Sequence, residues 1–158
     1  MTVLLGVDLG DRRIGIALGD SDSGSAIPVL TLRRGTHEQD GAAIGRICAE
    51  RRADAIVVGL PLHEDGTESE QSRRTREWVA AVVPMVGLPL TLRDERLTSQ
   101  SAEARLGRAP RGRAGGPPSP AARRARRARI DREAATLIVQ AELDAHAARD
   151  RVERRAAP

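Results

Sequence analysis

The hydrophobic positions of this chain fall into short runs, and each run predicts a strand. Apolar residues are nearly continuous within these runs, which is typical of strands that are buried on both faces of a sheet. The predicted strands cover residues 3–9, 14–18, 29–33, 55–60 and 88–93. The segment Gly10-Asp11-Arg12-Arg13 predicts a tight turn between the first two strands. We therefore expect an opening hairpin, which makes the second strand antiparallel to the first.

Helical patterns separate the later strands. Thr36 followed by Gln39 is a capping-box pattern, and Thr67 followed by Glu70 is a second one. Thr98 is expected to cap a third, shorter helix. The expected helices cover about residues 37–52, 67–83, 98–106 and 130–148. Strands that alternate with helices predict an α/β fold with a mixed sheet flanked by helices, in which ligands bind at the carboxyl ends of strands.

Two basic segments lack the apolar positions that would hold them against a core. Residues 107–129 are rich in Gly, Pro and Arg, and we expect a flexible loop because such a segment cannot offset the entropy of ordering. Residues 151–158 are expected to form a charged tail. Residues 1–150 then make a single domain, as the length of 158 residues suggests.

Composition narrows the classes of function. The chain is 40% hydrophobic but contains one Trp and no Phe or Tyr, so its core must be aliphatic. The formal net charge is +4, and all 26 basic residues are arginines, whose planar fork suits phosphate oxygens. The single cysteine, Cys48, excludes an internal disulfide, and its helical stripe predicts a core position. No signal peptide or membrane-spanning stretch is recognisable, so we expect a cytoplasmic protein with no membrane partner.

Three carboxylates are candidates for chemistry. Asp8 lies within an apolar strand, where an ionised carboxylate is costly unless something pairs with it. Glu95 follows the fifth strand, and Asp131 is expected to open the last helix on the face that packs against the sheet. Each residue also has a plain structural alternative, namely a turn-forming Asp, a charged strand end and a helix first-turn Asp. Together they suit a divalent cation such as Mg²⁺, which takes oxygen ligands.

Four blocks resemble, in order, the motifs of the YqgF/RuvX family. They are GVDLGDRRIGIALGD, VVGLPLHEDGTESEQSRRTREW, DERLTSQSAEARL and IDREAATLIVQAEL. Members are RNase H-like proteins described as pre-16S rRNA nucleases and as Holliday-junction resolvases. The resemblance implies an RNase H-like fold with a five-stranded mixed sheet whose second strand is antiparallel. It also implies that Asp8, Glu95 and Asp131 are catalytic residues that bind Mg²⁺ or Mn²⁺ for a two-metal type of phosphodiester hydrolysis.

Basic and polar side chains near these acids are candidates for phosphate contacts. They are Arg12, Arg13, Arg73, Arg74, Arg96, Thr98, Arg123, Arg124, Arg126 and Arg127. Because the single aromatic side chain, Trp78, is expected in the core, bases have no aromatic ring on which to stack, and recognition should depend on backbone charge and on the shape of the substrate. Specificity for an rRNA end would then require a partner such as the ribosomal particle.

The favoured function is a metal-dependent nuclease that processes the 5′ end of precursor 16S rRNA. The alternatives are an endonuclease that resolves branched DNA and a noncatalytic nucleic-acid-binding or antitermination factor. A further alternative is an actin-like or Hsp70-like ATPase, since those proteins open with a similar Asp-Leu-Gly hairpin, but they need two such domains. The sequence leaves open whether the protein is a monomer or a homodimer.

Overall fold

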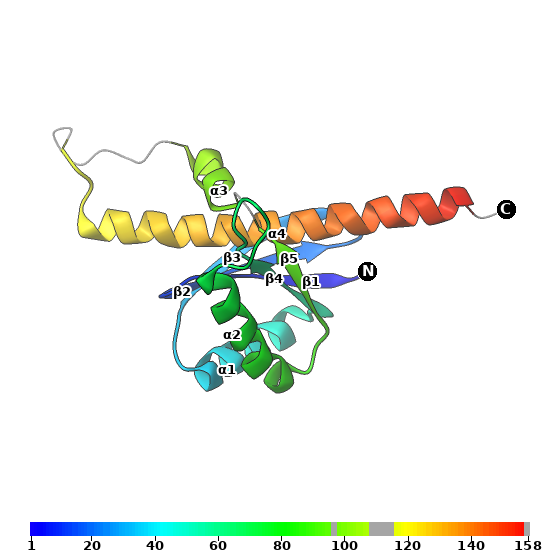
Figure 1. Cartoon of the computed structure of the whole chain (residues 1–158), viewed down its shortest axis with the longest axis horizontal. Helices are drawn as coiled ribbons and strands as arrows, with labels where there is room; N and C mark the ends of the chain where they lie inside the picture. The colour runs from blue at the N-terminus through cyan, green and yellow to red at the C-terminus, as the bar shows by residue number, and fades with distance from the viewer. Residues whose placement is uncertain (96–97, 108–115, 157–158) are drawn as a thin grey trace.

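The computed structural model, which describes residues 1–95, 98–107 and 116–156, contains one five-stranded sheet (Figure 1). Its strands are β1 (Val3–Leu9), β2 (Arg13–Asp20), β3 (Ser25–Arg33), β4 (Ala55–Leu60) and β5 (Leu90–Asp94). The spatial order is β3-β2-β1-β4-β5. β2 runs antiparallel to β1 and β3, whereas β1, β4 and β5 are parallel. The expected mixed sheet with an antiparallel second strand is confirmed.

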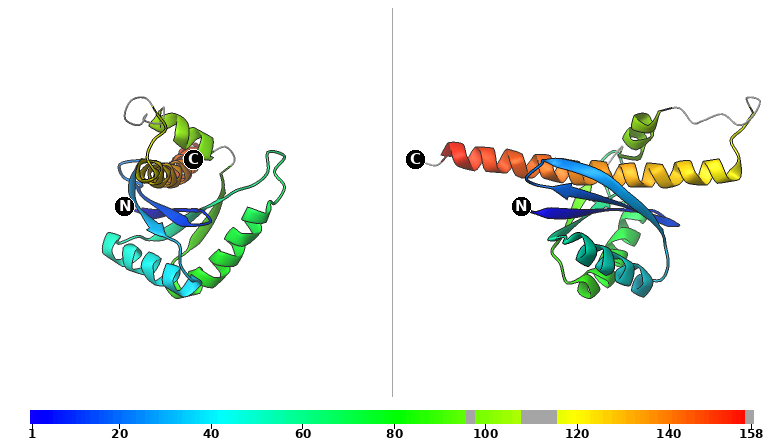
Figure 2. Two further views of the ribbon diagram at one scale, coloured as in Figure 1. Left: turned by 90° about the vertical axis from the view of Figure 1, so that its left-hand side faces the viewer. Right: turned by 180° about the vertical axis from the view of Figure 1, so that it is seen from behind.

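Helices cover both faces of this sheet. They are α1 (His37–Arg51), α2 (Glu70–Val86), α3 (Thr98–Leu106) and α4 (Pro120–Ala156). Figure 2 shows α1 and α2 on one face and α4 on the other. The main core lies under α1 and α2, where aliphatic side chains such as Leu5 and Ile44 surround Trp78 and Cys48. The predicted core positions of Cys48 and of an aliphatic interior are confirmed.

The opposite face of the sheet is built from small residues, and α4 lies directly on it. A Cβ atom at Gly6 would lie 2.0 Å from Val139 Cγ2, and one at Gly15 would lie 2.0 Å from the carbonyl oxygen of Asp131. At Gly19 the nearest atom, Val139 Cγ1, would be 2.2 Å away. Glycine at these three positions therefore permits the backbone of α4 to approach the first two strands.

Capping confirms one predicted helix start and corrects another. Thr36 and Gln39 form the expected capping box of α1. The α2 box is instead formed by Ser69 and Ser72, because Thr67 is engaged two residues earlier, where its amide and hydroxyl both donate to Asp65. The prediction that Thr67 opens this helix is wrong by three residues.

The segment 107–129 was expected to be a flexible loop, and the structure corrects most of that expectation. Residues 120–129 are the first part of α4, while residues 108–115 lie outside the described residues. The run AARRARRAR consists of strong helix formers, and Thr31 Oγ1 donates to the carbonyl of Ala128 at 2.6 Å. The expected charged tail is also wrong in part, because α4 continues through residues 151–156.

Other boundaries moved by a few residues. β2 continues to Asp20 and β3 begins at Ser25, four residues before the predicted run 29–33, because Gly24, with φ of 64°, turns the chain sharply. Asp131 does not open the last helix but lies in its interior, so the alternative role as a first-turn residue is removed. Within the described part of the chain, no helix is both long enough and apolar enough to cross a membrane.

Candidate active site

Asp8 lies on β1, on the face of the sheet that α4 covers. Alternation along the strand places Leu4, Gly6 and Asp8 on this face, and Leu5, Val7 and Leu9 on the face that packs under α1 and α2. Its cross-strand partner is Gly15, and the backbone of Asp131 passes over that glycine. Asp8 therefore lies beneath α4, next to the point at which the helix is closest to the sheet.

Glu95 reaches the same place from the end of β5. Its amide donates to the carbonyl of Leu60 at 3.2 Å, which continues the pairing of β5 with β4 beyond the last strand residue. Its carboxylate lies over Gly59, where an added Cβ would be 2.1 Å from Oε2. A side-chain hydrogen bond joins Glu95 to Asp8. The absence of a side chain at Gly59 thus makes the space in which the two carboxyl groups meet.

The two carboxyl groups have strongly perturbed acidities. Burial raises the pKa of Asp8, and the nearby charge of Asp131 raises it further, which outweighs the opposing effect of the hydrogen bond from Glu95. Burial also raises the pKa of Glu95, together with the charge of Asp8, the hydrogen bond between them and the charge of Asp94. The raised pKa values of Asp8 and Glu95 indicate that a negative charge on either carboxyl group is poorly compensated by its surroundings. A bound cation would relieve this cost.

Asp131 lies close enough to affect Asp8 electrostatically, but its carboxylate is paired elsewhere. Arg13 at the start of β2 donates from Nε to Asp131 Oδ2 at 2.5 Å. Among the described residues, no group of three His, Cys, Asp or Glu side chains is assembled as a metal site. The structure therefore brings Asp8 and Glu95 together and places Asp131 beside them, turned toward Arg13.

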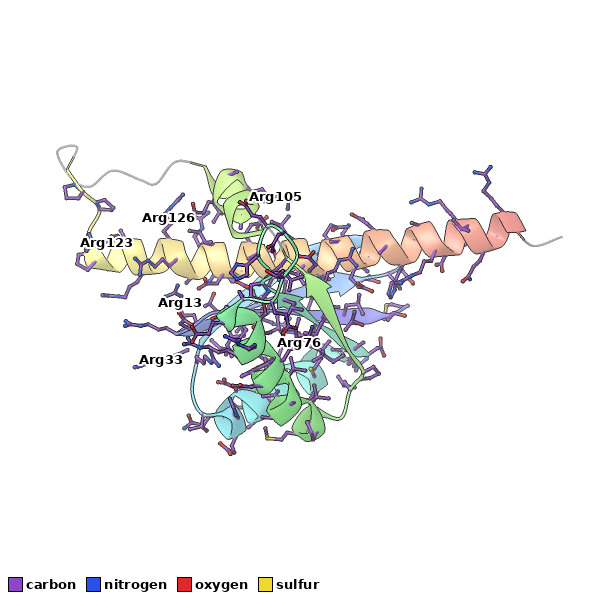
Figure 3. All side chains as sticks on the ribbon, in the orientation of Figure 1. Arg13, Arg33, Arg76, Arg105, Arg123 and Arg126 are labelled. Atoms are coloured by element: carbon purple, nitrogen blue, oxygen red, sulfur yellow. The ribbon has the colours of Figure 1, made fainter. Side chains whose placement is uncertain are left out.

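The predicted phosphate-binding arginines that the structure describes come from the β1–β2 hairpin, α2 and the first part of α4, and they differ in exposure. Figure 3 shows Arg123 and Arg126 on the first part of α4, which extends past the sheet, and Arg13 and Arg33 at the same end of the molecule. Arg12, Arg73, Arg124 and Arg127 are exposed, and Arg74 is exposed but pairs with Glu70.

Of the other predicted contacts, two are engaged with backbone carbonyls and two cannot be placed. Arg123 donates to the carbonyl of Pro118 at 2.7 Å, and Arg126 donates to that of Gly107 at 2.7 Å. Arg96 and the side chain of Thr98 lie outside the described residues.

Sequence reasoning missed three residues that shape this region. Gly59 interrupts an apolar strand, and that signal points to a close approach by another group. Arg33 is the cross-strand partner of Arg13. Arg93, two residues before Glu95, donates at 2.7 Å to Glu142 of α4, which is buried and also contacts His146 and Arg149. That ion pair holds β5 against α4, and no local pattern in the sequence predicts it.

Comparison with known proteins shows the family of this chain. The profile of the RuvX family, described as Holliday junction resolvase, matches residues 2–145. A protein of Anaeromyxobacter dehalogenans is 41% identical over 143 residues, which are 90% of this chain and 97% of that protein. A protein of Burkholderia ambifaria is 39% identical over 142 residues, or 89% of this chain and 88% of its own length. Both carry the name "Putative pre-16S rRNA nuclease".

Solved structures support the fold. Thermus thermophilus RuvC in complex with a Holliday junction substrate superimposes with a TM-score of 0.53 at 14% sequence identity, covering 92% of this chain and 96% of RuvC. A second structure of Thermus thermophilus RuvC gives a TM-score of 0.51. At this identity the likeness shows the RNase H-like fold of the resolvases and nothing finer. On the strength of the family profile and of the relatives that match along nearly their whole length, this chain belongs to the RuvX family.

Proposed function

We propose that this protein is a divalent-metal-dependent nuclease that hydrolyses phosphodiester bonds in structured nucleic acid. The observation that carries the proposal is the half-buried pair Asp8 and Glu95, whose carboxyl groups are in mutual contact and whose pKa values are raised by burial and by neighbouring negative charge. Uncompensated carboxylates cost stability. An assembly of this kind at the ends of two parallel strands is therefore typical of a functional site.

Mg²⁺ or Mn²⁺ fits the donor set, because the nearby ligands are carboxylate oxygens, which hard cations prefer. Asp8, Glu95 and Asp131 would hold the ion or ions. In a site of this type, the metal supplies an activated water and charge compensation for the leaving oxygen, and two ions divide these tasks. Gly59 contributes space for the carboxylate of Glu95, and the ion pair of Arg93 with Glu142 keeps the strand that carries Glu95 in place.

The first candidate substrate is the 5′ end of precursor 16S rRNA. The names of the relatives suggest it, and such a role would place the protein in the cytoplasm with the maturing ribosomal particle. The first part of α4 supports a charged, structured substrate, because residues 120–130 contain five arginines and no acidic residue. The rise of an α-helix separates Arg124 from Asp131 by about 10 Å, so this segment can contact phosphates a few nucleotides from the site of cleavage.

A time course of cleavage tests the proposal. The protein is given a structured RNA that carries the 5′ extension of 16S rRNA and, separately, a four-way DNA junction. Each reaction is run with Mg²⁺, with Mn²⁺ and with a chelator. Asp8→Asn is the test variant, and Asp150→Asn, on an exposed turn of α4, is the matched control. We expect metal-dependent cleavage that is lost in Asp8→Asn and kept in Asp150→Asn.

The second candidate function is resolution of branched DNA, which the family description and the RuvC-like fold favour. Symmetric nicking of the junction with the RNA untouched would establish it. That activity needs two sites acting on one junction, so sedimentation of the protein on the junction should then show a homodimer rather than a monomer. Binding of both substrates without cleavage would instead favour the noncatalytic factor.

A further inference from the structure

The pairing of Arg13 with Asp131 is the feature of the site that the metal-binding function does not explain. Arg13 Nε donates to Asp131 Oδ2 at 2.5 Å, with side chains that are 31% and 18% exposed. Asp131 is one of the three acids expected to bind metal, and a guanidinium already pairs with one of its two carboxylate oxygens. The same carboxylate acts on Asp8, whose pKa it helps to raise.

We infer that Arg13 is a positioning residue that holds Asp131 in the metal-free protein and gives up the carboxylate when the cation binds, so that its guanidinium becomes available to a substrate phosphate. This inference rests on the proposed function, because it concerns the same site. It assigns Arg13 two successive partners, a carboxylate of the protein and then a phosphate oxygen. Both are anions that the planar fork of arginine fits well.

The backbones on both sides of this pair are fixed, so the exchange requires only side-chain motion. Arg13 closes the opening hairpin, where its carbonyl accepts from the amide of Gly10 at 2.9 Å, and it pairs with Arg33 across the sheet. Asp131 lies within α4 with its carbonyl packed over Gly15. Neither backbone can retreat without breaking strand or helix hydrogen bonds. The side chain of Arg13, in contrast, is partly exposed and can rotate toward solvent.

Charge gives the exchange its direction. Without metal, three carboxylates lie near one another and Arg13 is the cation paired with Asp131 among the described residues. A divalent cation brings twice the charge of a guanidinium, so it attracts the carboxylate of Asp131 more strongly than Arg13 does. Once it binds, the cluster no longer needs Arg13, and repulsion from the metal favours rotation of the guanidinium away. The pair therefore competes with the metal and lowers its affinity.

Direct metal binding tests this competition. Mn²⁺ isotherms are measured by calorimetry for the wild type, for Arg13→Gln and for Arg12→Gln, without nucleic acid. We expect Arg13→Gln to bind Mn²⁺ about tenfold more tightly, the effect of removing one charge-assisted hydrogen bond. Arg12→Gln removes the same charge from the same turn, but Arg12 is exposed. It should therefore change the affinity by less than about twofold, since exposed charges are screened.

A second measurement reports where the guanidinium goes. In ¹H–¹⁵N spectra of the wild type, the Arg13 Nε–H resonance, assigned by its loss in Arg13→Gln, should shift on addition of Mg²⁺ toward the position of solvated arginines. Thermal unfolding of every variant confirms the fold. A merely structural role of Arg13 would weaken Mn²⁺ binding in Arg13→Gln and would leave the Nε–H signal unmoved.

The outcomes separate this inference from the proposed function. Unchanged or weaker Mn²⁺ binding by Arg13→Gln would overturn the inference even if the enzyme cleaves RNA. An equal gain in Arg12→Gln would overturn it as well, because the effect would then be one of overall charge. Tighter binding by Arg13→Gln alone would support it, even if neither nucleic acid were cleaved and the proposed function therefore failed.

Discussion

Gly59 offers a sharp test of the site, because replacing it with alanine acts on the carboxylate of Glu95 without touching any charge. A Cβ at this position would lie 2.1 Å from Glu95 Oε2 and 2.5 Å from Ile138 Cδ1. Both atoms are at the far ends of flexible side chains, so the fold can adjust. The carboxylate, however, cannot keep its place over β4.

The size of the effect follows from these distances. A carbon atom does not approach an oxygen closer than 3.0 Å, so Glu95 Oε2 must move by about 1 Å. A displacement of about 1 Å in a catalytic group can cost about 10²-fold in rate. Repacking should cost about 1–3 kcal/mol of stability, partly offset by about 0.4–1 kcal/mol because alanine restricts the unfolded chain. We therefore expect a folded protein with about one hundredth of the wild-type activity.

Single-turnover cleavage of the substrate that the wild type prefers measures this loss, and urea unfolding measures the stability of each variant. Gly45→Ala is the matched control, since a Cβ there would meet nothing within 4 Å. In the middle of α1 it should stabilise the fold by about 0.5–1 kcal/mol and leave the rate unchanged. Gly59→Ala with a rate within about threefold of the wild type would refute the placement of Glu95 in the active site.

Three further predictions concern stability. In the presence of a chelator, Asp8→Asn should increase the free energy of unfolding, and the increase should be larger at pH 8 than at pH 5. The pKa of Asp8 is raised in the folded protein, so ionisation of Asp8 opposes folding as the pH rises above the pKa of this group in the unfolded chain. An equal increase at both pH values, measured by urea unfolding, would contradict this. Burial tends to raise the pKa of Glu142, but hydrogen bonds and charge from Arg93 and His146 outweigh this effect and lower the pKa. Glu142→Gln should therefore reduce the free energy of unfolding by about 2 kcal/mol at pH 7. In urea titrations this difference should shrink below pH 4.5, where the glutamate is protonated in the unfolded chain. Trp78 Nε1 donates to buried Asp40 at 2.9 Å, so Trp78→Phe should reduce the free energy of unfolding by about 2–3 kcal/mol. Unfolding is followed by circular dichroism, because the variant has no tryptophan left for fluorescence.

Much of the fold was predictable because its signals are local. The bounds of β1 and β4 match the predicted runs 3–9 and 55–60, since each is continuously apolar and is ended by a glycine-containing turn or by Pro61. The capping box at Thr36 was equally readable. The start of α4 was missed because the prediction considered only buried apolar surface. The helix propensity of alanine and arginine, with support from Thr31, was enough to extend it.

The candidate residues could be chosen from the sequence, but their arrangement could not be predicted. Asp8 could be chosen because it is a carboxylate in an apolar strand and Asp131 because it lies on the packed face of a helix, whereas Glu95, at a charged strand end, was chosen from the resemblance to the family motif. Their contacts depend on residues far apart in the sequence, which no local pattern records. Arg13, which we expected to contact phosphate, is 118 positions from Asp131. The role of Arg13 toward nucleic acid stays a prediction, and the structure adds a partner that must be displaced first.

The face of the sheet that is built from small residues connects the fold with the candidate active site. Glycines at positions 6 and 15 allow α4 to lie on β1 and β2, and that approach carries Asp131 to the side of Asp8. Gly59 makes room for Glu95 on the neighbouring strand. Larger apolar residues at these positions would displace α4 and the side chain of Glu95, and they would hold the three carboxyl groups apart. The chain instead accepts carboxyl groups of raised pKa where α4 meets the strands, and the proposed cation site would explain a cost of this kind.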